Sequence, residues 1–181
     1  MEAPFFVKVV LNQEQIRAGV ERLAGQVRAW YEERPITVVG VMTGSLVLLA
    51  DLIRLLDMPL KVGLVQAASY EGTNRRPLSI NPDMMPDVVG HDVLLVDDIF
   101  DTGHTLVEVV ALIRSLGPKS LRSAVLLRKE GRQQVEHHPD FVAFDIDNQF
   151  VVGYGLDYCD AYRNLPYVAA LEPDELHEPA E

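Results

Sequence analysis

Short β-branched apolar runs alternate with longer amphipathic segments in this chain, and that alternation limits its folds more than any other feature. The runs that we expect to form strands are 36–42, 60–68, 93–96, 123–127, 141–146 and 150–154. Apolar residues recur three or four positions apart after Asn12, which with Gln15 has the spacing of a capping box. Further helices are expected over 46–56 and 104–116. The alternation predicts an α/β fold, with a mainly parallel twisted sheet flanked by helices on both faces.

Ligands of such folds bind at the carboxyl ends of the parallel strands. The first four of these ends are Met42, Ala68, Val96 and Leu127. A long irregular segment, 69–90, follows the second strand, and connections of this length are usually functional lids or disordered. It contains Arg75 and Arg76, so it could cover an anionic ligand.

Composition fits a globular protein, with 48% hydrophobic and 24% charged residues among 181. We expect one domain over 1–181, with an acidic tail that frays from about residue 172. Lys and Arg number 16 against 27 Asp and Glu, a net charge of −11. This balance argues against binding to nucleic acid through its phosphates, although a helix N-terminus can still bind a small anion.

Cys159 is the single cysteine, which excludes an intrachain disulfide and a cysteine-based metal cluster. One free cysteine fits a reducing compartment. The first ten residues lack the layout of a signal peptide, and no apolar run is long enough to cross a bilayer. We therefore expect a cytoplasmic protein with no membrane partner.

The most informative segment is 93–106, Val-Leu-Leu-Val-Asp-Asp-Ile-Phe-Asp-Thr-Gly-His-Thr-Leu. A buried strand leads into Asp97 and Asp98, and a turn then leads into a helix. The turn 101–105 offers backbone N–H groups, two hydroxyls and a glycine, which suit a monophosphate at a helix N-terminus. Two neighbouring carboxylates suit ribose hydroxyls and a hard divalent cation. An acidic pair alone is more often a polar strand end, but the whole pattern favours a ligand site.

This segment closely resembles the phosphoribosyl pyrophosphate (PRPP) signature of type I phosphoribosyltransferases. Other segments resemble the hypoxanthine-guanine phosphoribosyltransferases. They are Met42-Thr43-Gly44-Ser45 (pyrophosphate loop), Ser69-Tyr70 (start of the active-site lid), Leu126-Leu127-Arg128-Lys129 (strand end that carries the base-recognition lysine, Lys129), and 139–142, 150–154, 156–158 and 162–165 (C-terminal hood). The resemblance implies a type I phosphoribosyltransferase-like sheet with a small hood from both termini. It also implies that PRPP and a 6-oxopurine give IMP or GMP and pyrophosphate in purine salvage, with Mg²⁺.

The resemblance assigns a role to each matching residue. Asp101 would be the general base near N7 of the purine. The 5′-phosphate would be held by Thr102, Gly103, His104 and Thr105. Asp97 and Asp98 would engage the ribose hydroxyls, directly or through metal-bound water, and Asp157 would help to hold a second Mg²⁺. An ordinary loop carboxylate is nearly as good an interpretation of Asp157.

Other matching residues would bind the base and the pyrophosphate. Lys129 would donate to the purine O6, and a lysine cannot accept a hydrogen bond from an amino group there. Phe150 would stack on the base while the Val151 backbone meets its edge. Arg163 would bind pyrophosphate together with Met42, Thr43 and Gly44, and Ser69 and Tyr70 would start the lid. Without the resemblance, Lys129 would be an exposed turn charge and Phe150 a core aromatic residue.

Two residues depart from the family pattern. Thr43 stands where many relatives have Lys after a cis peptide bond, so some pyrophosphate contact is in doubt, and the sequence leaves the isomer of Met42–Thr43 open. His104 stands where Lys or Arg is frequent, which makes any charge assistance to the phosphate pH-dependent.

Two other functions remain open at this stage. Some relatives of this fold are PRPP-dependent RNA-binding regulators, although the acidic charge and Asp101 argue against that function. The base could also be xanthine, adenine or a pyrimidine, although Lys129 and Phe150 favour a 6-oxopurine. The resemblance further implies a homodimer or homotetramer.

Overall fold

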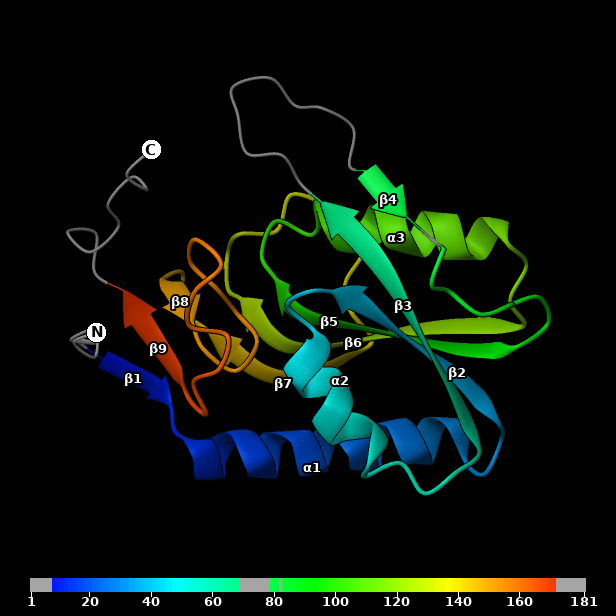
Figure 1. The fold of residues 1–181 in the computed structure, drawn as a ribbon, viewed down its shortest axis with the longest axis horizontal. Helices are drawn as coiled ribbons and strands as arrows, with labels where there is room; N and C mark the ends of the chain where they lie inside the picture. The colour runs from blue at the N-terminus through cyan, green and yellow to red at the C-terminus, as the bar shows by residue number, and fades with distance from the viewer. Residues whose placement is uncertain (1–7, 69–78, 82, 172–181) are drawn as a thin grey trace.

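The computed structural model describes residues 8–68, 79–81 and 83–171. A six-stranded sheet in the order β4-β3-β2-β5-β6-β7 forms the centre of the molecule (Figure 1). Its strands are β2 (Ile36–Met42), β3 (Leu60–Ala68), β4 (Ser79–Asn81), β5 (Asp92–Phe100), β6 (Ser120–Lys129) and β7 (Phe141–Ile146). All neighbours are parallel except β3 and β4. The carboxyl ends of five strands therefore lie at one edge, as the alternating pattern predicted.

Alternate residues of the strands build two separate cores. Leu94 and Val96 of β5 pack with α1 (Gln13–Tyr31) and α2 (Leu46–Ile53) on one face. Val93 and Leu95 pack on the other face with α3 (His104–Ser115). Figure 1 shows α1 and α2 together at the bottom and α3 at the top. Helices on both faces explain why the central strands are apolar throughout.

Helix α1 begins as its sequence predicted. The Asn12 side chain accepts a hydrogen bond from the Gln15 backbone at 2.9 Å, and the Gln15 side chain accepts one from the Asn12 backbone at 2.8 Å. These reciprocal bonds satisfy two N–H groups that a helix start leaves without partners.

A second, three-stranded antiparallel sheet joins the two ends of the chain. It contains β1 (Lys8–Leu11), β9 (Val168–Leu171) and β8 (Phe150–Val152), in the order β1-β9-β8. We call this sheet and the segment 153–167 the hood. The sequence did not predict β1 or β9, because four residues are too few for a clear period. The strand expected over 150–154 stops at Val152, and the three residues after it have positive φ angles.

Other boundaries also differ from the expectation. β5 runs on to Phe100 because β6 continues beside it and pairs with it as far as Arg128, so Asp97 and Asp98 lie inside the strand. β6 is longer than 123–127, α2 is shorter than 46–56, and β4 lies in the segment expected to be irregular. The tail from 172, and Ser69 and Tyr70, lie outside the described residues.

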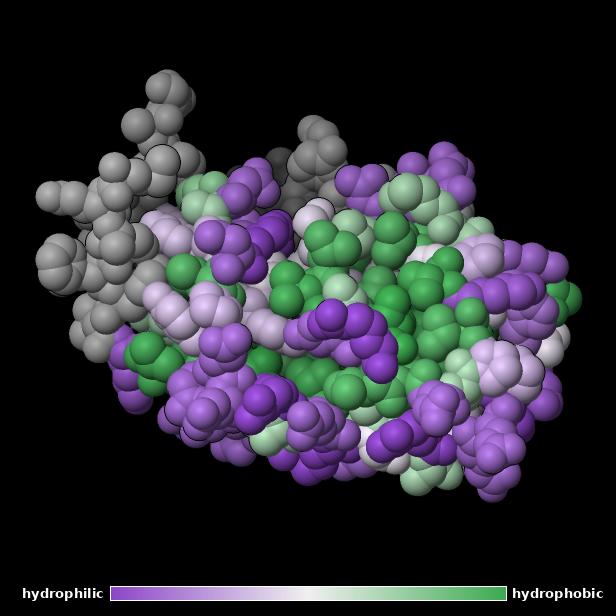
Figure 2. All heavy atoms as spheres, turned by 60° about the horizontal axis from the view of Figure 1, so that its bottom comes forward, coloured by the Kyte–Doolittle hydropathy of each residue, from purple (hydrophilic) through white to green (hydrophobic). Residues whose placement is uncertain are grey.

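The face that carries α1 and α2 exposes apolar side chains. Figure 2 brings this face forward and shows hydrophobic residues gathered at its middle. Leu46 at the start of α2, Leu55 just after its end, and Val62 of β3 are 47%, 36% and 44% exposed. Within the described chain, no helix has the length and apolar character that a membrane crossing requires.

Two glycines of α1 provide a test of how tightly this helix packs. A Cβ at Gly19 would lie 2.1 Å from the Phe144 ring, whereas one at Gly25 would meet nothing within 4 Å. We expect Gly19→Ala to lower the free energy of unfolding by about 1–3 kcal/mol through overpacking. Gly25→Ala should raise it by roughly 0.5–1 kcal/mol, because alanine loses less backbone entropy. Urea denaturation measures both values, and equal effects would contradict the tight contact with β7.

Candidate active site

A cleft of about 720 Å³ opens at the carboxyl edge of the sheet, between the strand ends and the hood. Loops that leave neighbouring parallel strands toward opposite faces create such a crevice. Twelve of the residues selected from the sequence line it: Met42, Thr43, Gly44, Asp97, Asp98, Asp101, Thr102, Gly103, Thr105, Phe150, Asp157 and Arg163. Residues from four parts of the chain thus meet in one place.

The acidic pair lies at the bottom of this cleft. Asp97 is buried and Asp98 is half-buried. One Asp97 oxygen accepts a bond from the Asp98 backbone at 2.9 Å, and one Asp98 oxygen accepts a bond from the Ile99 backbone at 2.7 Å. Burial, and then the charge of Asp98, raises the pKa of Asp97 well above its usual range, and burial also raises the pKa of Asp98. Such a pair favours a cation or hydroxyl groups as its partner.

The turn after β5 leads directly into α3, as its sequence predicted, and we call its residues 102–105 the cradle. Gly103 has a φ of 91° and precedes the first residue of α3. The N–H groups of the first helical turn have no partners inside the helix, so they can donate to an anion. A Cβ at Gly103 would lie 2.4 Å from the Val135 side chain, so the turn is closely packed. The His104 ring bonds Gln134 at 3.2 Å and is not among the residues that line the cleft.

Asp101 lies at the side of the cradle and forms two ion pairs. Its Oδ2 accepts a bond from Lys129 Nζ at 2.9 Å, and its Oδ1 accepts one from Arg132 Nε at 3.0 Å. Burial raises the pKa of Asp101, but the two hydrogen bonds outweigh it, so that the pKa lies below the usual value. Lys129 is buried and is not among the residues that line the cleft, but it contacts Asp101, which is. The sequence did not point to Arg132.

The loop after β2 packs tightly between the acidic pair and the hood. The Met42–Thr43 peptide bond is cis. A Cβ at Gly44 would lie 1.7 Å from Asp98 Oδ2, and a Cβ at Gly155 would lie 2.2 Å from the Gly44 carbonyl oxygen. Contact at these distances requires glycine on both sides.

Arg163 connects the hood to the cleft. It donates to the Gly155 carbonyl at 2.8 Å and pairs with Asp157 Oδ1, also at 2.8 Å. The other Asp157 oxygen accepts a bond from the Asp160 backbone at 3.0 Å. Asp157 is therefore fixed in place before any ligand arrives.

Comparison with known proteins agrees with this geometry. The family model of the phosphoribosyl transferase domain matches residues 7–159. The hypoxanthine-guanine phosphoribosyltransferase of Aquifex aeolicus is 39% identical over 173 residues, which cover 92% of this chain and 95% of the relative. The chain belongs to the phosphoribosyltransferase family.

Two further relatives show how much of each protein the likeness covers. The bifunctional protein TilS/HprT of Listeria monocytogenes is 37% identical over 92% of this chain, which spans only 26% of that protein. A solved hypoxanthine phosphoribosyltransferase of Staphylococcus aureus is 34% identical, with a TM-score of 0.89 over 96% of this chain and 95% of that one. The type I phosphoribosyltransferase fold is thus shown.

Two residues expected to bind the base, Phe150 and Val151, differ in their exposure. Val151 is buried in β8 and does not line the cleft. Phe150 does line it and is 39% exposed, with the Tyr158 ring edge-on at 5.5 Å. The sequence missed several lining residues, namely Gln66, Ala67, Tyr158, Cys159 and Asp160. Their one signal was position, because they lie at the carboxyl end of β3 or close after Asp157.

The donor set of the cleft fits Mg²⁺ in part. Among the described residues, no three histidine, cysteine or acidic side chains converge on one point. Mg²⁺ commonly keeps several waters and takes one or two carboxylates plus substrate phosphates. Asp97 and Asp98 fit that demand. Asp157 fits it less directly, because both of its oxygens already accept protein donors.

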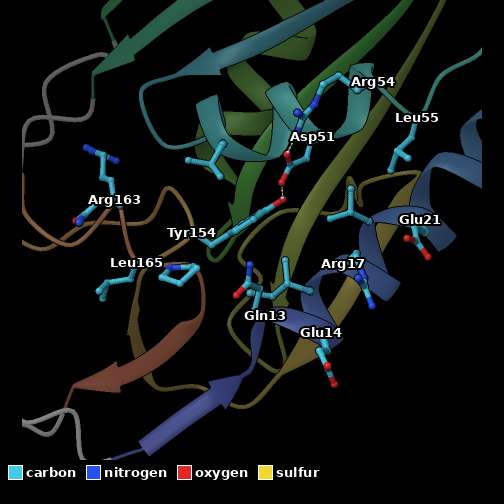
Figure 3. Close-up of a pocket in the computed structure, with 15 residues that line it drawn as sticks. Gln13, Glu14, Arg17, Glu21, Asp51, Arg54, Leu55, Tyr154, Arg163 and Leu165 are labelled. Atoms are coloured by element: carbon cyan, nitrogen blue, oxygen red, sulfur yellow. Dashed lines mark hydrogen bonds and ion pairs between the residues drawn. The ribbon is translucent and has the colours of Figure 1, made fainter.

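A second cavity, of about 830 Å³, lies between the hood and helices α1 and α2 (Figure 3). Tyr154 donates to Asp51 of α2 at 2.6 Å at its wall and so anchors the hood. Arg163 lines both cavities. The acidic residues assigned to the ribose and the base, Asp97, Asp98 and Asp101, line the smaller cleft and not the larger cavity. The smaller cleft is therefore the candidate active site.

Two glycines with positive φ test the contact between hood and loop. Gly155 (φ 99°) meets the Gly44 carbonyl, whereas Gly117 (φ 78°) has nothing within 4 Å of an added Cβ. Gly117→Ala should cost about 1–2 kcal/mol of stability from backbone strain alone. Gly155→Ala should cost about 1–3 kcal/mol more, because the hood must shift. Equal losses on urea denaturation would mean that the contact is not tight.

Proposed function

We propose that this enzyme transfers the 5-phosphoribosyl group of PRPP to N9 of hypoxanthine or guanine, giving IMP or GMP and pyrophosphate. One observation carries the proposal: an acidic pair suited to ribose lies between a phosphate cradle and a glycine loop. Asp101, which pairs with Lys129, directly precedes the cradle in the chain. These are the groups that a sugar with a 5′-phosphate and a 1′-pyrophosphate requires.

In this reaction, the bond from C1′ to pyrophosphate breaks and the bond from N9 to C1′ forms. The purine gives up one proton, which Asp101 would take from N7. The electron pair of the broken C1′–O bond leaves with pyrophosphate. Lys129 would donate to the purine O6 and Phe150 would stack on the ring. Positioned proton transfer of this kind is typically worth ~10²–10⁴-fold in rate.

The phosphates would be bound by backbone groups more than by free cations. Thr102, Gly103, His104 and Thr105 would hold the 5′-phosphate, and Met42, Thr43, Gly44 and Arg163 the pyrophosphate. Val151 would meet the base edge through its backbone. Ser69 and Tyr70 would begin a lid that excludes water, and both lie outside the described residues.

Mg²⁺ would be held by Asp97 and Asp98 on the ribose side and by Asp157 on the pyrophosphate side. A bound divalent cation supplies positive charge against the leaving pyrophosphate. The buried, like-charged pair Asp97 and Asp98 supports this proposal, because a cation would relieve their mutual repulsion.

We also propose a cytoplasmic homodimer or homotetramer. The apolar face that carries Leu46, Leu55 and Val62 is consistent with self-association, since surfaces of this kind often mark interfaces. The alternative of an RNA-binding regulator is opposed by the net charge of −11. A gel shift with structured RNA should give no complex at physiological salt.

A spectrophotometric assay tests the function directly. With PRPP and Mg²⁺, we expect turnover of hypoxanthine or guanine, and at least about 100-fold lower kcat/KM for adenine, whose amino group meets the Lys129 donor. Xanthine is assayed in parallel. Chelation of Mg²⁺ should abolish turnover, and its return should restore it. Preferred use of adenine, or full activity in excess chelator, would contradict the proposal.

Changing Asp101 to Asn tests the general base. The amide keeps the shape of the side chain but cannot take a proton, so kcat should fall by roughly 10²-fold or more while PRPP binding persists. Asp145→Asn is the matched control, because Asp145 also pairs with a basic residue, Arg128, but lies outside the cleft. Steady-state kinetics and calorimetric PRPP binding measure both effects. Unchanged turnover would remove Asp101 from this role.

A further inference from the structure

Arg132 contacts the carboxylate to which the proposed reaction gives a proton. Its Nε lies 3.0 Å from Asp101 Oδ1, on the opposite oxygen from Lys129. Lys129 and Arg132 are the charged side chains that contact Asp101 in the described structure, one from β6 and one from the turn after it. Two donors on two different oxygens fix the plane of a carboxylate, whereas one donor leaves it free to rotate.

The turn that carries Arg132 is held at several points. Glu130 N donates to Ile146 O at 2.9 Å, and Gln134 N donates to Thr102 O at 3.0 Å. The Gln133 side chain donates to the Lys129 carbonyl. Arg132 therefore lies on a short segment that is tied to β7, to β6 and to the phosphate cradle. Its side chain is 42% exposed, but the turn that carries it is held close to Asp101 by these hydrogen bonds.

From this geometry, and resting on the proposed function, we infer that Arg132 is a positioning residue for the general base. Together with Lys129 it holds the Asp101 carboxylate ionised and in one orientation, so that Oδ2 stays directed toward the purine proton. The Lys129 ammonium has three N–H groups, so it can donate to O6 while it keeps its contact with Oδ2. The contact from Gln134 to Thr102 fixes this arrangement relative to the 5′-phosphate. Because each carboxylate oxygen can accept two hydrogen bonds, the pair with Arg132 persists during proton transfer.

Kinetics of Arg132→Gln test the inference. We expect kcat to fall about tenfold while the KM for PRPP changes by less than about twofold. A misdirected base slows the chemical step but removes no contact with PRPP. The acid limb of the pH profile should move to higher pH by about half a unit to one unit, because loss of a cation favours the protonated carboxyl. Arg132→Lys, which keeps the charge, should restore the limb.

Arg128→Gln is the matched control. Arg128 is an arginine four positions earlier that pairs with Asp145 and does not line the cleft, so its loss should leave kcat and the acid limb unchanged. An acid limb that stays in place in Arg132→Gln overturns the inference, as does an equal shift in Arg128→Gln. Thermal unfolding of each variant separates these effects from loss of folding.

A measurement without turnover separates this inference from the proposed function. The carboxyl ¹³C signal of Asp101, assigned by its loss in Asp101→Asn, is titrated in the wild-type protein and in Arg132→Gln. A higher titration midpoint in the variant supports the role of Arg132 even if no purine substrate is turned over, in which case the proposed function alone fails. An identical midpoint overturns the role of Arg132 even if the wild-type protein converts hypoxanthine.

Discussion

Three parts of the protein meet at Gly44, where only a residue without a side chain fits. Asp98 lies against it on one side, at 1.7 Å from where a Cβ would stand, and Gly155 of the hood approaches its carbonyl on the other. The acidic pair, the loop after β2 and the hood are therefore fixed relative to one another. The cleft depends on this contact, because it sets the distance between the sheet edge that would bind the sugar and the segment that carries Arg163.

The electrostatics of the cleft follow from its acidic setting. Lys129, Arg132 and Arg163 each pair with a carboxylate in the described structure. These cations are thus already paired, and a substrate with a 5′-phosphate and a pyrophosphate group would rely on backbone N–H groups and on Mg²⁺. This arrangement makes the replacement of a family lysine by Thr43 understandable, since the proposed site does not depend on one free cation. The two ion pairs of Asp101 would then matter for catalysis, because they hold the proposed base in place.

Much of the fold could be predicted from the sequence, because the strongest signals are local. Strands β2, β3 and β7 have the expected bounds, and the capping box of α1 forms as expected. The predicted strands were wrong where pairing with another strand decides whether a segment forms a strand or where that strand ends. Asp97 and Asp98 belong to β5 because β6 pairs beside them, and no local pattern places two acids inside a strand. Strands β1 and β9 exist because the ends of the chain pair with each other.

The sequence by itself determined the α/β class, the segment 93–106 and the residue types that the chemistry requires, because these depend on periodicity and on neighbouring side chains. Only the tertiary structure decided which of those residues share one cleft. It gave Asp101 a second partner in Arg132, 31 positions away, and left Val151 buried in β8 while its neighbour Phe150 lines the cleft. Contacts between distant segments depend on how the sheet registers and how the hood packs, and a linear pattern contains neither.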